Sequence, residues 1–319
     1  MLFLTEADVR ALLPMPEAIR LMRTVFEHLA SGEALNQPRR RLVLKTGAVL
    51  HSMAASDGKY FGIKIYSTHP VRGAHFVFLL YRAEDGLPLA LLEANYLGQI
   101  RTGAVSGLAT QILAREGVET VGIIGSGFQA RSQLEALCTA WPVQRARVWS
   151  RSPEKRAAFA AEASETLGIP VEAVETAERA VRDAGILITA TNAREPVLES
   201  AWVAPGTHIN AMGSNQARRR ELPADLVRRA DWIVVDSREQ ARMESGDLLL
   251  ALDDQDWNSP RLLELPDAIG RGASLRSHPG QITIFKSNGL AAEDVIAAGY
   301  VYERAKESGR GRVMDLLYS

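Results

Sequence analysis

The sequence contains one cysteine, Cys138, among 319 residues. One cysteine cannot form an internal disulfide, and it excludes a zinc site built from several cysteines. This scarcity makes a cytoplasmic location the default expectation. The chain also lacks a run of about 18 uncharged apolar residues, and its first residues lack a basic segment followed by an apolar one. We therefore expect neither a membrane-spanning segment nor an export signal.

An excess of charge of one sign is lacking as well, because 37 Lys and Arg side chains stand against 38 Asp and Glu side chains, for a formal net charge of −1. This balance gives no electrostatic reason to expect nucleic acid or an anionic membrane surface as a partner. His69 and His75 have no cluster of carboxylates near them in the sequence, so we expect no metal site. The length is sufficient for one large or two ordinary domains, and we expect a small molecule as the ligand.

The segment from Glu119 to Ala130 is typical of a buried strand, a tight turn and the start of a helix. Its small residues follow the GxGxxG/A pattern of dinucleotide-binding domains. In such domains the first glycine makes the turn, the second lets the backbone approach a pyrophosphate, and the third small residue lets the helix pack on the strand. A pattern this short also occurs in ordinary turns, but the strands and helices that alternate after it favour the dinucleotide site. The predicted cofactor-binding residues of this turn are Gly125, Ser126, Gly127, Phe128, Gln129 and Ala130.

Short apolar segments alternate with helical ones after this turn, which indicates a doubly wound parallel sheet. We expect its strands at 121–124, 146–149, 171–174, 186–190, 208–211, 232–235 and 282–285, and a surface loop at 255–280. Before the turn, two helical segments precede five predicted strands at 39–45, 49–54, 60–66, 76–81 and 89–93, and a helix at 99–114. The prediction is an α/β protein with a Rossmann domain at 114–302 and a discontinuous α+β domain at 1–113, completed by about 303–319.

The end of the second Rossmann strand carries Ser150, Arg151 and Ser152, where NAD-binding domains usually place an acidic side chain. A carboxylate would repel a 2′-phosphate, whereas an arginine and two hydroxyl groups can bind one, so these residues favour NADP(H). The alternative is that Arg151 is a solvated surface residue and that Glu154 reaches the ribose of NAD(H). Further cofactor contacts are expected after later strands, with Thr191 and Asn192 beside the adenosine half, Ser287 and Gly289 near the nicotinamide, and Met212 and Gly213.

Several separate motifs resemble the ornithine cyclodeaminase/μ-crystallin family over nearly the whole chain. They are the segments at 37–40, 62–64, 99–104, 125–130, 209–213 and 285–289, followed by Glu293 and Asp294. The resemblance implies a discontinuous substrate-binding and dimerisation domain beside the Rossmann domain, and a homodimer joined through the substrate domains. The family includes ornithine cyclodeaminases, cyclic ketimine and pyrroline-2-carboxylate reductases, alanine dehydrogenases, iminosuccinate reductases and the crystallin.

Three cations of the first domain are candidates for binding the substrate. Lys64 lies on the strand face opposite to Ile63 and Ile65, and Arg101 opens a predicted helix, where a cation is unfavourable unless an anion is near. By resemblance, Lys64, Arg101 and Arg40 bind the substrate carboxylate, and we expect Lys64 also to relay a proton. Arg40 is chosen for its place two residues after Pro38, and a shift of one residue would give its role to Arg41.

Two positions depart from the cyclodeaminases of the family. Asn215 stands where those enzymes carry an aspartate that handles the side-chain amine, and an amide cannot take a proton from an ammonium group. His51 stands where they carry a glutamate, and it is either a proton donor or a packed structural histidine. Asn215 is expected to bind the substrate or the nicotinamide amide, or to cap the segment after Gly213. Both departures count against ornithine cyclodeamination.

The sequence therefore predicts an NAD(P)H-dependent reductase of an α-imino acid or cyclic ketimine carboxylate, which gives an L-amino acid and can run in reverse as an amino-acid dehydrogenase. Two alternatives stay open. One is a cyclodeaminase that releases ammonia from a diamino acid, and the other is a crystallin-like protein that binds NADPH and a small carboxylate without turnover.

Overall fold

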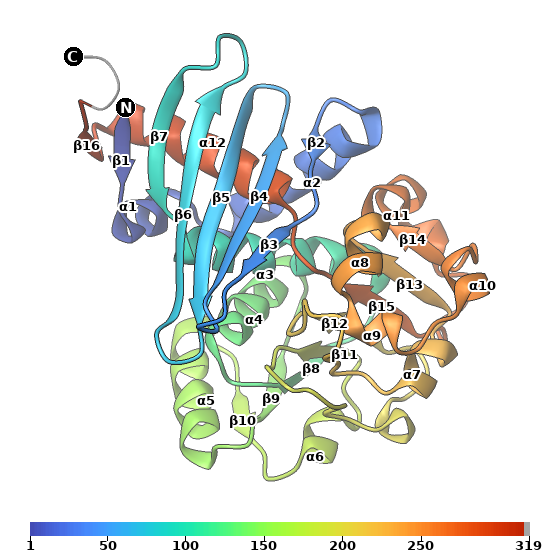
Figure 1. The fold of residues 1–319 in the computed structure, drawn as a ribbon. Coiled ribbons are helices and arrows are strands. Elements are labelled where there is room, and N and C mark those ends of the chain that lie inside the picture. The colour runs from blue at the N-terminus through green and yellow to red at the C-terminus, as the bar shows by residue number, and fades with distance from the viewer. Residues whose placement is uncertain (316–319) are drawn as a thin grey trace. The chain divides into compact units, whose positions relative to one another are not determined.

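The computed structural model of the protein describes residues 1–315, with residues 273 and 274 described by their backbone alone. The chain forms two compact units, one made of residues 1–101 together with the chain from 289 onward, and the other of residues 102–288 (Figure 1). Within the described residues, no helix combines the length and the apolar character needed to cross a membrane.

The first unit is built on a mixed sheet with the strand order β16-β1-β7-β6-β5-β4-β2, in which β3 also pairs with β4. Neighbouring strands are antiparallel except for the parallel pair β1 and β7. The strands are β1 (Leu2–Leu4), β2 (Leu35–Asn36), β3 (Arg40–Val43), β4 (Val49–Ser56), β5 (Tyr60–His69), β6 (Gly73–Arg82), β7 (Pro88–Glu93) and β16 (Arg312–Val313). The five predicted strands are confirmed, whereas the three very short ones carry no readable pattern and were not predicted.

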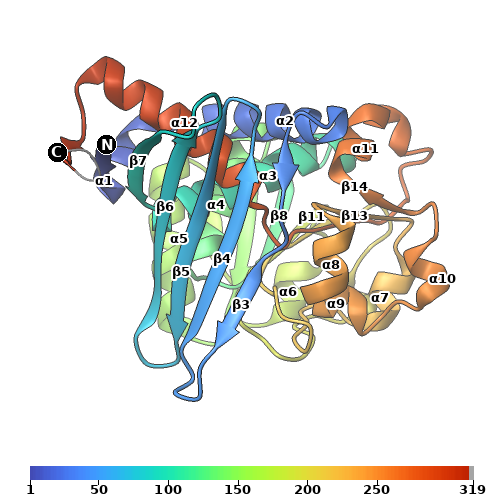
Figure 2. The same cartoon turned by 45° about the horizontal axis from the view of Figure 1, so that its top comes forward.

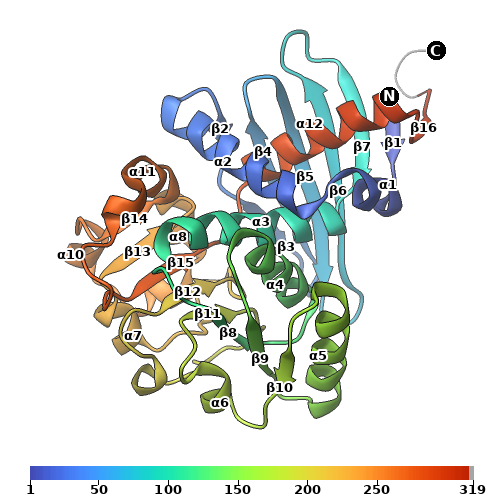
Figure 3. The same ribbon diagram turned by 180° about the vertical axis from the view of Figure 1, so that it is seen from behind.

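Three helices belong wholly to this unit: α1 (Glu6–Leu12), α2 (Met15–Ser31) and α12 (Ala291–Ser308). Thr5 begins α1 with a capping box, in which its hydroxyl group accepts a hydrogen bond from the backbone of Asp8. Helices α2 and α12 lie across one face of the sheet (Figure 3). The opposite face of the sheet is left uncovered by the helices of this unit (Figure 2).

The second unit contains a wholly parallel sheet with the order β10-β9-β8-β11-β12-β15-β13-β14. Its strands are β8 (Thr120–Ile124), β9 (Arg145–Trp149), β10 (Val171–Ala173), β11 (Ile186–Thr189), β12 (His208–Ala211), β13 (Trp232–Val235), β14 (Leu262–Glu264) and β15 (Thr283–Lys286). The strand order reverses between β8 and β11, as in a doubly wound fold. The predicted fold class is confirmed.

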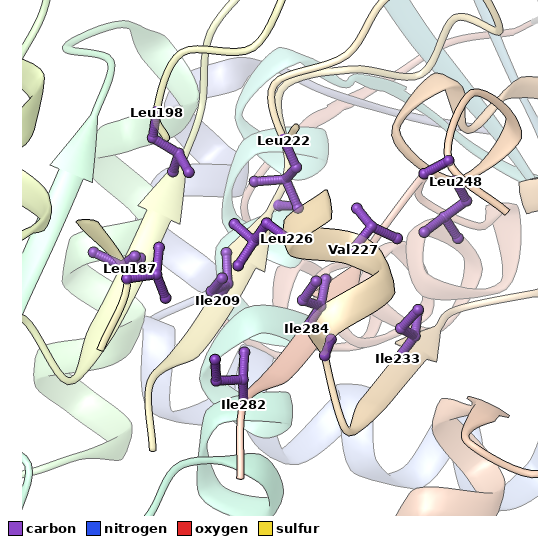
Figure 4. Close-up of a cluster of buried hydrophobic side chains, with 14 of the residues drawn as sticks. Leu187, Leu198, Ile209, Leu222, Leu226, Val227, Ile233, Leu248, Ile282 and Ile284 are labelled. Atoms are coloured by element: carbon purple, nitrogen blue, oxygen red, sulfur yellow. The ribbon is translucent and has the colours of Figure 1, made fainter. Parts of the chain in front are cut away.

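Helices pack on both faces of this sheet because its strands are apolar on both faces. They are α4 (Phe128–Ala140), α5 (Pro153–Leu167), α6 (Ala177–Val181), α7 (Ala224–Arg229), α8 (Arg238–Glu244), α9 (Gly246–Leu249), α10 (Asp254–Trp257) and α11 (Leu265–Arg271), with short 3-10 turns at Ser200–Trp202 and Gly272–Leu275. Figure 4 shows one apolar layer, in which Leu226 and Leu248 belong to the same buried cluster as Ile209, Ile233 and Ile284 of the strands. The second layer joins α4 and α5 to the other face.

The segment 255–280 is not the surface loop that the sequence predicted. It contains most of α10, all of β14 and α11, and a 3-10 turn, and β14 adds an eighth strand to the parallel sheet. Leu262 and Leu263 are buried, but an apolar run of two residues is too short to reveal a strand by periodicity.

The units divide inside helix α3 (Asn95–Leu113) and again before α12. From Thr102 onward α3 packs on α4, since a Cβ atom at Gly103 would lie 2.3 Å from the carbonyl oxygen of Ser132. The predicted domain boundaries lay later, at 113/114 and 302/303. In the structure the whole of α12 belongs to the first unit, whereas the prediction had placed most of this helix in the Rossmann domain. Residues 316–319, the end of the segment expected to complete the first domain, lie outside the described residues. The roles assigned to the two domains stay predictions.

Candidate active site

The glycine turn between β8 and α4 has the features of a pyrophosphate site. Gly125 has a φ of +115°, and a Cβ atom there would lie 2.4 Å from the carbonyl oxygen of Ala190, so only glycine fits. A Cβ atom at Gly127 would meet no atom within 4 Å, which leaves room beside the backbone. Gly127 is the N-cap of α4 and makes no side-chain hydrogen bond, and a helix N-terminus of this kind favours an anion. Ala130 is fully buried where α4 packs on the sheet.

The remaining residues of the turn surround this space. Ser126 donates a hydrogen bond to Ser150 over 2.8 Å, which joins the turn to the end of β9. Phe128 is exposed, and the side-chain oxygen of Gln129 is buried with no hydrogen-bond partner among the described residues. These residues fit a bound dinucleotide cofactor.

The end of β9 presents a cation and hydroxyl groups, as the sequence predicted. Arg151 is exposed, and its guanidinium group donates to the side-chain oxygen of Asn192 over 3.4 Å. Ser152 begins α5 as its N-cap and accepts a hydrogen bond from the backbone of Lys155. Asn192 follows β11, so the hydrogen bond spans the point where the strand order reverses.

Other predicted cofactor residues also lie beyond the carboxyl ends of parallel strands. Met212 is buried with its sulfur 3.3 Å from the hydroxyl oxygen of Ser106. Ser287 donates to the buried carboxylate of Asp236 over 2.9 Å. Asn215 is half-buried in the irregular segment after β12.

Sequence reasoning missed the buried charges beneath these strand ends. The missed residues are Glu221, Asp236, Asp247 and Lys286. Their signal in the sequence was a charged residue next to an apolar run, which also describes many surface positions.

A second site, which we call the cation cluster, lies entirely in the first unit and consists of Arg39, Lys64, Arg101, Glu293 and Asp294. All five side chains are buried. The Nζ atom of Lys64 lies 2.7 Å from Asp294 Oδ2, and Arg101 Nε lies 3.1 Å from Asp294 Oδ1. Arg101 Nη1 lies 2.6 Å from Glu293 Oε2. Strand β5, helix α3 and helix α12 thus meet through ion pairs.

The ionisation of the cluster follows from burial and from these pairs. Burial, and then the charge of Arg101, lower the pKa of Lys64 to about 8, although Asp294 opposes both. Burial also lowers the pKa of Arg101, but Asp294 and Glu293 outweigh it and raise this pKa above its ordinary value. Although burial raises the pKa of Asp294, the charges of Arg101 and Lys64 hold it below its ordinary value. Three cations therefore face two carboxylates, which leaves a formal excess of one positive charge.

Arg39, not Arg40, is the third cation of the cluster. Arg39 is 4% exposed, and its guanidinium group lies 3.3 Å from the sulfur of Met53 and 3.5 Å from the carbonyl oxygen of Gly289. Arg40 is exposed and pairs with Ser52, on the strand face opposite to Lys64. The expectation for Arg40 is wrong because a shift of one residue in a strand turns every side chain to the other face.

One further expectation for this region needs correction, and one stays a prediction. Gly289 lies in the first unit beside the cation cluster, and its place near the nicotinamide stays a prediction. Its φ is +78°, and a Cβ atom there would lie 2.6 Å from Arg101 Nη1. Arg101 does not open a helix, because α3 begins at Asn95, and the anions that compensate its charge are Glu293 and Asp294.

His51 lies on the same face of the sheet as Lys64. Its ring stacks on Tyr66 at a centroid distance of 4.2 Å, and Tyr66 stacks on Phe76 at 4.6 Å. Its Nε2 atom lies 3.0 Å from the hydroxyl oxygen of Thr68, whereas Nδ1 is buried with no hydrogen-bond partner among the described residues. Burial, followed by the charges of Arg41 and Arg39, lowers the pKa of His51 to about 4. The ring is therefore neutral near pH 7.

A pH dependence of stability follows for His51. The unfolded chain binds a proton at this residue near pH 6.5, whereas the folded protein binds it only near pH 4. The contribution of His51 to stability is therefore complete above about pH 6.5 and is lost as the pH falls towards 4. We expect the unfolding free energy of wild type minus that of His51→Gln to decrease over this interval, measured by chemical denaturation. A difference that does not change with pH would mean that the pKa of His51 is the same in the folded and the unfolded protein.

Comparisons with known proteins show the family of the chain. The model of the ornithine cyclodeaminase/mu-crystallin family matches residues 1–309. Delta(1)-pyrroline-2-carboxylate reductase of Bacillus cereus is 34% identical over 99% of this chain and 100% of that protein. The enzyme of the same name from Thermococcus litoralis, solved with NADH and L-proline, is 36% identical with a TM-score of 0.93, over 98% of this chain and 100% of that one. An archaeal alanine dehydrogenase dimer with bound NAD is 31% identical with a TM-score of 0.91, over 99% of both chains. The chain belongs to the ornithine cyclodeaminase/mu-crystallin family.

Proposed function

We propose that this protein is an NAD(P)H-dependent oxidoreductase that reduces the C=N bond of an α-imino acid or cyclic ketimine carboxylate to an L-amino acid. The observation that carries the proposal is the buried cation cluster with its excess of one positive charge. The relatives support it, since two are named Delta(1)-pyrroline-2-carboxylate reductase and one of these holds NADH and L-proline. The glycine turn supports the nicotinamide cofactor.

The charge of the cluster favours a substrate with one carboxylate. The described residues of the cluster include three buried cations and two carboxylates, and such a positively charged site favours the binding of an anion. Arg39 and Arg101 can each donate two parallel hydrogen bonds to a carboxylate. The neighbouring wall is apolar, with Met53, Tyr66 and Ala291 in one buried cluster, and it suits the hydrocarbon part of a monocarboxylate.

Lys64 is suited to supply the proton. Reduction adds a hydride to the carbon of the C=N bond and a proton to its nitrogen. The reduced nicotinamide, when bound, supplies the hydride. With a pKa of about 8, Lys64 holds a proton at neutral pH and can give it up more readily than an ordinary lysine. Asp294 orients its Nζ atom, and Lys64 regains the proton from water.

The test of this function is the oxidation of NADPH and of NADH, followed by absorbance, with a panel of imines. The panel contains pyrroline-2-carboxylate, piperideine-2-carboxylate, and pyruvate, glyoxylate or oxaloacetate with ammonia or methylamine. We expect turnover of at least one monocarboxylate and slower turnover of the dicarboxylate formed from oxaloacetate. If the cofactors bind but no imine is reduced, the proposal fails. Ammonia release from ornithine would instead indicate a cyclodeaminase.

Arg39 and Arg40 offer a matched pair of variants for the substrate site. Arg39→Ala removes a buried cation of the cluster, so we expect kcat/KM for the imine to fall by about a hundredfold or more, while the cofactor Kd is unchanged. Arg40→Ala removes an exposed cation from the opposite face and should change kcat/KM by less than about threefold. Steady-state kinetics and cofactor titration measure both. Equal losses in the two variants would disprove the assignment of Arg39.

For the cofactor, we propose that NADP(H) is preferred. Arg151 supports this preference, because its guanidinium group is exposed beside two serine hydroxyl groups at the end of β9. Solved relatives hold NADH or NAD, so the preference of this chain has to be measured.

Arg151→Ala tests the preference directly. We expect the Kd for NADPH to rise roughly tenfold or more and the Kd for NADH to change little, because only NADPH offers a 2′-phosphate. Arg145→Ala, at the other end of the same strand, is the control and should leave both constants unchanged. If the ratio of the Kd for NADPH to the Kd for NADH is the same in Arg151→Ala as in the wild type, the proposed preference for NADP(H) is wrong and NAD(H) is the expected cofactor.

We also propose a homodimer formed through the first unit. The sheet face opposite to Lys64 exposes apolar side chains on adjacent strands, with Leu42 at 60%, Leu50 at 44%, Val77 at 41% and Phe61 at 36% exposure. Contiguous apolar patches of this kind mark interfaces between proteins. The alanine dehydrogenase relative is a dimer, which supports the proposal.

Val77→Lys places a charge within this face and should shift the protein from dimer to monomer in sedimentation velocity. Val71→Lys, in the turn between β5 and β6, introduces the same charge at a position that is 82% exposed and should leave the dimer intact. Dissociation by both variants, or by neither, would contradict the choice of this face.

A further inference from the structure

Glu221 is a fully buried carboxylate that connects the ends of β11 and β12. Its Oε1 atom accepts hydrogen bonds from the backbone N–H of Thr191 over 2.6 Å and from the Thr191 hydroxyl group over 2.7 Å. Its Oε2 atom accepts from the hydroxyl group of Thr189 over 2.9 Å and from the backbone N–H of Gly213 over 2.8 Å. The segments that follow the two strands are therefore held by one side chain.

The four donors require a carboxylate at this position. Each oxygen of Glu221 receives one backbone N–H group, which can only donate. A glutamine of the same shape would turn its NH₂ group towards one of these N–H groups and lose that hydrogen bond. The segments also approach closely, because a Cβ atom at Gly213 would lie 2.3 Å from the carbonyl oxygen of Thr191 and 2.4 Å from Glu221 Oε1.

Two further buried charges extend the connection to β15. Asp247 Oδ1 accepts the backbone N–H groups of Glu221 and Leu222, over 2.6 and 2.9 Å. The Nζ atom of Lys286, the last residue of β15, lies 3.5 Å from Asp247 Oδ2. It also donates to the carbonyl oxygens of Ala211, Ser214 and Ser287. Burial, and then Asp247, raise the pKa of Glu221, while Thr191 and Lys286 oppose this shift.

The strands joined in this way, β11, β12 and β15, lie on one side of the point where the strand order reverses, and β9 and β10 lie on the other side. In a doubly wound fold each side takes one half of the dinucleotide, and the end of the second strand, here β9, takes the adenosine ribose. The β11 side of the sheet then takes the nicotinamide half. Thr191 follows β11 and therefore belongs to this half, although the sequence analysis had expected Thr191 beside the adenosine half.

We propose that Glu221 is a positioning residue that shapes the nicotinamide half of the cofactor site. It fixes the segments after β11 and β12 without touching the cofactor, and Asp247 and Lys286 fix Glu221 and the segment after β15. The inference rests on the proposed cofactor binding but not on the identity of the imine.

The test compares whole cofactors with fragments that lack the nicotinamide half. The Kd values of NADH and NADPH, and of ADP and its 2′-phosphorylated analogue, are measured by calorimetry for wild type and Glu221→Gln. We expect the whole cofactors to bind about tenfold or more weakly to the variant, and the fragments to change by less than about threefold. Equal weakening of cofactors and fragments, or no weakening, would overturn the proposal.

Two other variants keep this test decisive. Thr189→Val keeps the shape of a fully buried side chain and removes one of the four hydrogen-bond donors to Glu221. It should weaken the binding of the whole cofactors but not of the fragments, by a smaller factor than Glu221→Gln. This variant provides the test if Glu221→Gln does not fold. An unchanged ratio of cofactor to fragment affinity in Thr189→Val would then count against the proposal. Asp231→Asn alters a carboxylate that accepts the N–H of Ile282 before β15, at the amino ends of the strands, and should change neither affinity. A wild-type protein that binds cofactor but reduces no imine would refute the proposed reaction and leave this inference intact.

Discussion

The structure depends most on the compensation of buried charge in the cation cluster. Lys64 on β5 and Arg101 on α3 are buried, and each needs a counterion in a medium that screens charge poorly. Asp294 and Glu293 supply the counterions from the first turn of α12. The chain returns to the first unit after the last strand of the parallel sheet, and this return brings the two carboxylates to the two cations.

Buried charge is also compensated in the second unit, but by different partners. Here a buried carboxylate, Glu221, is compensated mainly by backbone N–H and hydroxyl donors, and a lysine, Lys286, is bound by backbone carbonyl oxygens. Such contacts hold irregular segments that have no ladder of their own. The parallel strands fix where each following segment begins, and the buried charges determine how the segments after the strands are arranged.

Much of the architecture was predictable because apolar periodicity and glycine chemistry are local signals. The predicted parallel strands and the glycine turn were read correctly from neighbouring residues. The prediction was wrong where the local signal is weak. Strand β14 presents too short an apolar run, and the helix predicted at 99–114 begins earlier, at Asn95. Both errors concern boundaries or short elements, where tertiary contacts outweigh local preference.

The sequence by itself determined the two kinds of sheet, the turn that suits a dinucleotide and the presence of candidate cations at Arg40 or Arg41, Lys64 and Arg101. Only the tertiary structure decided which arginine belongs to the cluster, because the register of β3 against β4 fixes the face on which each side chain lies. It likewise brought Gly289 and Asp294 to Arg101 and revealed Glu221 as a shared acceptor. These contacts join residues far apart in the chain, and no local pattern encodes which distant partner a buried charge will meet.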